Sequence, residues 1–167
     1  MKGGNNMYSD KTLSAQILED FNFEETKKNI SNYFICFEKL EWEWVKLNAQ
    51  KGLIANYDFS IEYKKQPYIP FGKDAFNLSA KECKEEQLKI YISSYYWAKS
   101  TLSDMEQRYI VECFINRKYE DELVDLLGFN SCDSSDFRNL KRSAVYKFAD
   151  CQGLVVKRIK GDFRKNE

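Results

Sequence analysis

The stretch EDELVDLLGFNSCDSSDFRNLKRSAVYKFADCQG, Glu120–Gly153, decides the fold that we expect for this chain. It opens with alternating acidic and apolar residues that predict a short helix over 120–127, which Gly128 ends. A polar turn follows, and then a longer amphipathic pattern that predicts a helix over 134–152, which Gly153 ends. A short helix, a turn and a longer helix are the parts of a helix-turn-helix.

Helical spacing divides the side chains of the predicted helix over 134–152 into two faces. Four apolar residues are expected to point inward: Phe137, Leu140, Ala144 and Phe148. The opposite face is polar and basic, and its side chains are the candidate contacts to double-stranded DNA: Ser134, Ser135, Arg138, Asn139, Lys141, Arg142 and Lys147. Arg and Asn match guanine and adenine edges, so base contacts are assigned to Arg138, Asn139 and Arg142. The Ser and Lys side chains suit phosphates. The alternative is a solvated amphipathic helix that only completes a bundle.

A second long helix is predicted over 24–51, where neither proline nor glycine occurs. Large apolar side chains recur there at alternating steps of four and three, which places them on one stripe: Tyr33, Phe37, Leu40, Trp44 and Leu47. We interpret the stripe as packing within the chain. The same spacing is also typical of a seam that pairs two chains, so a homodimer is the alternative.

The remaining segments predict an all-α fold, with an N-terminal long-helix region and a C-terminal helix-turn-helix bundle. The connector over 53–78 holds both prolines, and a short strand is expected within it at Tyr57–Tyr63. The length of the connector suggests a hinge between two lobes. Capping boxes at Ser79 and Ser103 predict helix starts. The expected organisation is a loose segment over 1–23, a helical region and connector over 24–78, a helix-turn-helix domain over 79–155 and a basic tail over 156–167.

Charge is balanced overall but segregated along the chain, with 26 basic and 26 acidic side chains. Residues 134–167 hold nine basic and four acidic side chains, whereas residues 103–133 hold three basic and eight acidic ones. A neutral chain with a basic end can still present one face to phosphates. The charge pattern is therefore compatible with DNA binding.

The composition argues against most enzymatic and metal chemistry. Histidine is absent, and the five cysteines form no Cys-x-x-Cys motif, so we expect no metal, no cofactor and no catalytic site. Acidic clusters at 82–86 and 120–125 are interpreted as solvated helix faces. An odd number of cysteines in apolar contexts is typical of reduced thiols, which predicts a cytoplasmic protein. No apolar run approaches the ~18–20 residues that span a bilayer, and the polar N-terminus does not resemble a signal peptide.

Several stretches resemble one known family. They are ETKKNISNYF (25–34), FEKL (37–40), IANY (54–57), LSDMEQRYI (102–110), LLG (126–128) and LKRSAVYKFA (140–149). Together they resemble the ArpU family of phage and prophage transcriptional regulators over roughly residues 24–155. The C-terminal part is also similar to region 4 of sigma factors, a helix-turn-helix that reads promoter DNA. The turn over 129–133 is longer than the family's, and Asp133 and Asp136 add negative charge beside it.

The resemblance implies sequence-specific DNA binding and control of late phage or prophage genes. One alternative function is a phage protein–protein adaptor that binds a host factor such as RNA polymerase. Another is a DNA-packaging protein similar to the small subunit of terminase, which also carries a helix-turn-helix but assembles as a ring.

Overall fold

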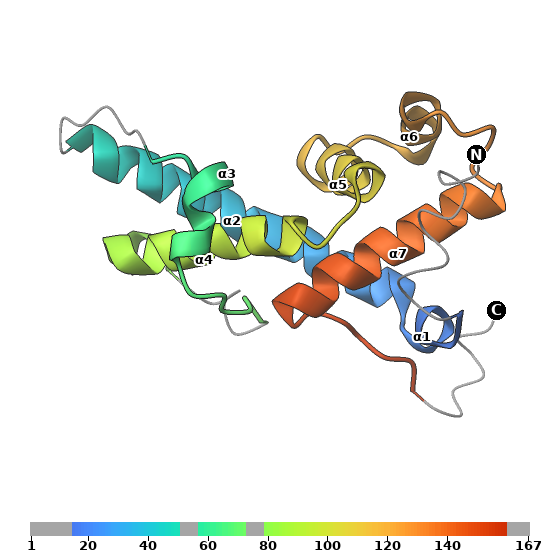
Figure 1. The fold of residues 1–167 in the computed structure, drawn as a ribbon, viewed down its shortest axis with the longest axis horizontal. Helices are drawn as coiled ribbons and strands as arrows, with labels where there is room; N and C mark the ends of the chain where they lie inside the picture. Colours follow the sequence, from blue (N-terminus) through green and yellow to red (C-terminus); the bar gives the residue numbers. More distant parts are fainter. Residues whose placement is uncertain (1–14, 51–56, 73–78, 160–167) are drawn as a thin grey trace.

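The computed structural model describes residues 15–50, 57–72 and 79–159, and it confirms an all-α fold for them (Figure 1). These residues form no sheet; an isolated antiparallel bridge joins Phe21 to Lys157. Residues 1–14 of the loose segment expected over 1–23, and residues 160–167 of the basic tail expected over 156–167, lie outside the described residues, whereas residues 15–20 form a helix. In chain order, the elements are α1 (Ala15–Asp20), α2 (Phe23–Gln50), α3 (Phe59–Glu62), η2 (Tyr63–Lys65), η4 (Ala80–Glu82), α4 (Glu85–Lys99), α5 (Asp104–Ile110), η5 (Val111–Ile115), α6 (Glu120–Leu127) and α7 (Ser135–Gln152).

Helix α7 runs through the middle of the fold and packs against α2, α4 and α5 (Figure 1). Aromatic rings fill the space where these helices meet. The ring of Phe148 lies 5.4 Å from that of Tyr33, 5.5 Å from that of Phe34 and 6.1 Å from that of Tyr95. Since α2 precedes the connector and α4 and α7 follow it, the segments on both sides of residue 78 contribute to one core.

Local signals placed most helix ends correctly. The Asn22 side chain accepts a hydrogen bond from the Glu25 backbone at 3.1 Å, directly before the long helix α2. Ser103 and Glu106 form the predicted capping box of α5. Gly128 ends α6 with φ 83°, a left-handed conformation that costs glycine little.

The predicted apolar stripe of α2 is internal, which confirms the interpretation as packing within the chain. Tyr33, Phe37, Leu40 and Trp44 are buried, and Leu47 packs partly buried against them. A helix face filled by its own chain offers no seam to a second copy, so any pairing of chains must use another surface.

Two expectations about the connector and its end are wrong. The strand expected at Tyr57–Tyr63 is helical instead, because Asp58 accepts a hydrogen bond from the Ser60 backbone at 3.0 Å and starts α3. The capping box expected at Ser79 does not start the long helix, since only the short turn η4 follows it. Helix α4 begins at Glu85 instead, where the Gln87 side chain in its first turn accepts a hydrogen bond from the Lys84 backbone at 2.8 Å.

Candidate nucleic-acid interface

Helices α5, α6 and α7 form the three-helix unit that contains the predicted helix-turn-helix (Figure 1). Helix α5 packs against both α6 and α7. After Gly128, the Phe129 backbone donates to the Val124 carbonyl at 2.9 Å, and its ring lies 5.3 Å from that of Phe137 in α7. These contacts fix the turn between α6 and the start of α7.

The predicted DNA-facing side chains of α7 differ widely in exposure. Ser135 and Arg138 are exposed, whereas Ser134, Asn139, Lys141, Arg142 and Lys147 are half-buried. Ser134 is the helix cap, and its hydroxyl accepts from the Phe137 backbone at 3.2 Å. The accessible part of α7 is therefore its N-terminal end, which is the end that enters the major groove in a helix-turn-helix.

Two of the predicted phosphate contacts lie in ion pairs within the chain. The Lys141 Nζ is 2.6 Å from Glu120 Oε2 on α6, and the Lys147 Nζ is 3.0 Å from both carboxylate oxygens of Glu106 on α5. Each lysine side chain is only 14% exposed. Both ammonium groups thus hold α7 to its neighbours, and a DNA phosphate would have to compete with a carboxylate for them.

Glu106 is the centre of a buried polar network. Its side chain is fully buried, and one oxygen accepts from Ser143 Oγ at 2.6 Å while the other accepts from the Ser103 backbone at 2.8 Å. With Lys147, these donors satisfy a charge that would otherwise be costly to bury. The network links the start of α5 to the middle of α7.

Three arginines gather beside the N-terminal half of α7. The Arg142 guanidinium lies over the rings of Phe21 and Phe23, with its carbon 5.1 and 5.8 Å from their centroids. Burial lowers the pKa of Arg142, and the positive charges of Arg158 and then Arg138 lower it further, against an opposing effect of Glu19. Arg142 thus lies within electrostatic range of both Arg158 and Arg138, and we call these three residues the arginine cluster.

Arg158 was not among the predicted site residues. It follows the bridge from Phe21 to Lys157, and its backbone donates to the Asp20 carbonyl at 2.8 Å. This return of the chain beyond Gly153 brings Arg158 beside Arg142. Helical periodicity carries no signal for that approach, and the only hint in the sequence is the excess of basic residues after residue 134.

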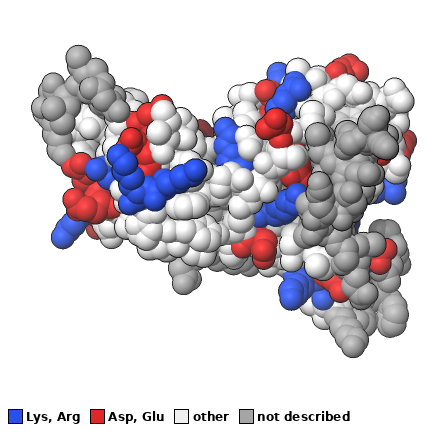
Figure 2. Space-filling model, viewed as in Figure 1, with Lys and Arg blue, Asp and Glu red and all other residues white. Residues whose placement is uncertain are grey.

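The wider surface is mixed in sign. Figure 2 shows basic and acidic side chains in small adjoining groups on one face of the molecule. Asp133 and Asp136, at the start of α7, are both exposed.

Within the described residues, no cluster of Cys, Asp or Glu side chains could hold a metal ion, the five cysteines are free thiols, and no helix has the length and apolarity to cross a bilayer.

Comparison with known proteins adds no family assignment: no family model, curated protein or solved structure matches this chain.

Proposed function

We propose that this protein is a sequence-specific DNA-binding regulator of transcription, as its resemblance to phage and prophage regulators suggests. The observation that carries the proposal is the combination of a helix-turn-helix arrangement with an arginine cluster beside the accessible end of α7. In this proposal α6 braces α7, and α7 enters a major groove with its N-terminal turns.

The base contacts are proposed for Arg138, Asn139 and Arg142. Arg138 is the most accessible of them, since it is exposed one turn after the cap Ser134. Ser135 and Arg158 are proposed to contact phosphates. Ser134 is not available for such a contact, because its hydroxyl caps α7 and its backbone N–H donates to the Ser131 carbonyl at 3.3 Å. Lys141 and Lys147 contribute mainly to the stability of α7 in this proposal, because they are paired with Glu120 and Glu106.

A selection from a pool of random DNA duplexes, followed by fluorescence anisotropy on the enriched sequence, tests the proposal. Arg138→Gln should weaken binding to the selected duplex by about tenfold, the loss typical for one bidentate base contact of ~1–3 kcal/mol. Lys64→Gln removes the same charge from an exposed position on η2 and serves as the matched control.

The salt dependence gives an independent check. If Arg158 neutralises one phosphate while Arg138 and Arg142 contact bases, log K should fall with log salt with a slope of roughly −1. A pool in which no sequence is enriched, or an Arg138→Gln variant that binds as well as the Lys64→Gln control, would overturn the assignment of α7 as a recognition helix. In that case an adaptor function, which needs no DNA contact, becomes the stronger hypothesis.

A further inference from the structure

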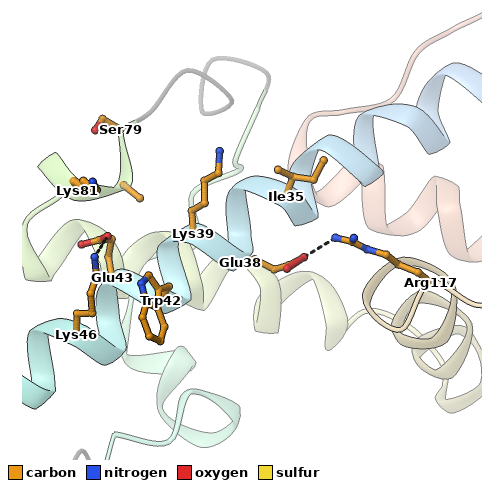
Figure 3. Close-up of a pocket in the computed structure, with 10 residues that line it drawn as sticks. Ile35, Glu38, Lys39, Trp42, Glu43, Lys46, Ser79, Lys81 and Arg117 are labelled. Carbon is orange, nitrogen blue, oxygen red and sulfur yellow. Dashed lines mark hydrogen bonds and ion pairs between the residues drawn. The ribbon is translucent and has the colours of Figure 1, made fainter.

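A groove lies on the outer face of α2, opposite the buried aromatic stripe (Figure 3). Its volume is about 750 Å³, and Ile35 and Trp42 form its apolar floor with 47% and 60% of their surfaces exposed. The turn η4 forms one wall with Ser79, Ala80 and Lys81, and Arg117 stands at the other end. Trp42 is a large ring that a solvent-facing helix rarely presents without a partner.

The rim of this groove is basic. Four cations line it, Lys39, Lys46, Lys81 and Arg117, against two carboxylates. Both carboxylates are already paired, Glu38 with Arg117 at 2.9 Å and Glu43 with Lys46 at 2.7 Å. The ammonium groups of Lys39 and Lys81 have no carboxylate partner among the described residues, so the groove favours an acidic occupant with apolar anchors.

Helix α6 of this same chain has that chemistry. Its outer face carries the exposed carboxylates of Asp121, Glu122 and Asp125. Tyr119 and Leu126 are exposed by 79% and 42%, although both are large apolar side chains. Tyr119 and Leu126 are seven residues apart, as are Ile35 and Trp42, which corresponds to about 10 Å along a helix. The anchors of α6 therefore match the spacing of the groove floor.

We propose that the groove on α2 receives α6 of a second copy, and that the contact is reciprocal in a two-fold dimer. Each copy supplies one groove and one acidic helix, so the contact forms twice. The two surfaces adjoin, because Arg117 lines the groove and Tyr119, the residue that precedes α6, follows two residues later. A chain with zero net charge does not repel its own copy at long range. The inference is independent of DNA binding, since α7 takes no part in it.

Complementary charge reversals test the pairing by sedimentation equilibrium without DNA. The wild type should reach twice the chain mass of 19.8 kDa. A groove variant, Lys39→Glu with Lys81→Glu, and a helix variant, Asp121→Lys with Asp125→Lys, should each self-associate at least tenfold more weakly. Mixed together, the two variants should form a heterodimer, because both of its contacts again join opposite charges. A chain that carries all four reversals should pair with itself.

Circular dichroism of each variant establishes that it is folded, and Lys39→Gln with Lys81→Gln replaces the groove variant if the reversal unfolds it. A wild type that stays monomeric at the highest concentration reached overturns the proposal. A mixture of the two folded variants that fails to associate also overturns it. So do single-surface variants that dimerise as well as the wild type, because a dimer through any other surface would not respond to these charges. Failure here leaves the DNA-binding assay unaffected, so the two proposals are tested separately.

Discussion

The buried pair of Glu106 and Lys147 offers the sharpest test of how α7 is held. Glu106→Gln preserves the size of the side chain, but it removes the negative charge opposite the Lys147 ammonium and leaves one acceptor oxygen in place of two. Breaking one partner of a buried ion pair costs ~3–5 kcal/mol, because the remaining charge is left uncompensated. The Lys147 side chain keeps 14% of its surface exposed and can shift its ammonium group toward water, so we expect about 3 kcal/mol, the lower end of that range.

Urea unfolding followed by tryptophan fluorescence measures this loss. With a slope of about 2 kcal/mol per molar urea, a loss of 3 kcal/mol lowers the unfolding midpoint by about 1.5 M. Glu38→Gln is the matched control, since it breaks the exposed pair with Arg117, whose two side chains are 56% and 65% exposed. Exposed pairs contribute ~0–1 kcal/mol, so this control should change the midpoint little.

The double variant Glu106→Leu with Lys147→Met separates charge from packing. Replacing both partners of a buried pair by apolar groups is often neutral, so the double variant should be more stable than either single substitution. Ser143 and the Ser103 backbone would lose an acceptor, which keeps the recovery partial. If Glu106→Gln shifts the midpoint no more than Glu38→Gln does, the network contributes little and the reasoning about α7 is refuted.

Three further predictions concern caps, a turn and tyrosine burial. Gly128→Ala should destabilise the protein by about 1 kcal/mol, measured by urea unfolding, because φ of 83° strains an L-residue although space is open there; an unchanged midpoint would contradict this. Ser134→Ala removes the cap of α7 and should also cost ~1 kcal/mol, whereas Ser134→Asp should retain stability, and equal midpoints for both variants would dismiss the cap. Burial raises the pKa of Tyr33 and of Tyr109, so their ionisation favours the unfolded chain: stability should hold below about pH 10 and then fall by ~1.4 kcal/mol per pH unit for each tyrosine. A free energy of unfolding that stays constant above pH 10 would show that burial does not hinder the ionisation of these two rings.

The sequence predicted helix positions well wherever the signal was local. Asn22, Ser103 and Ser134 are caps whose partners lie three residues away, and Gly128 and Gly153 end their helices by backbone conformation alone. Such signals need no knowledge of the rest of the fold. The failure at Ser79 shows their limit, because a capping sequence also fits a single turn such as η4 that ends before a longer helix begins.

The candidate site was harder to predict because its residues meet through the tertiary structure. Lys147 and Glu106 are 41 residues apart, and Arg158 reaches Arg142 only after the chain turns back at Gly153. A helical wheel assumes one buried face and one solvated face. Helix α7 contacts α2, α4 and α5 around its circumference, so side chains on its polar face, such as Lys147, meet other helices rather than water.

The same reasoning explains why α2 carries a surface that its apolar stripe did not reveal. Helical periodicity reveals the stripe that contains Tyr33 and Trp44, which is buried by α4 and α7. Ile35 and Trp42 lie on the opposite side of the helix, where none of the helices in the described part of the chain covers the groove floor. A long helix with apolar side chains on both faces satisfies one face by folding and leaves the other to association. In the proposed dimer, α2 and the acidic face of α6 together join the two copies, while the accessible end of α7 in each copy takes no part in the contact.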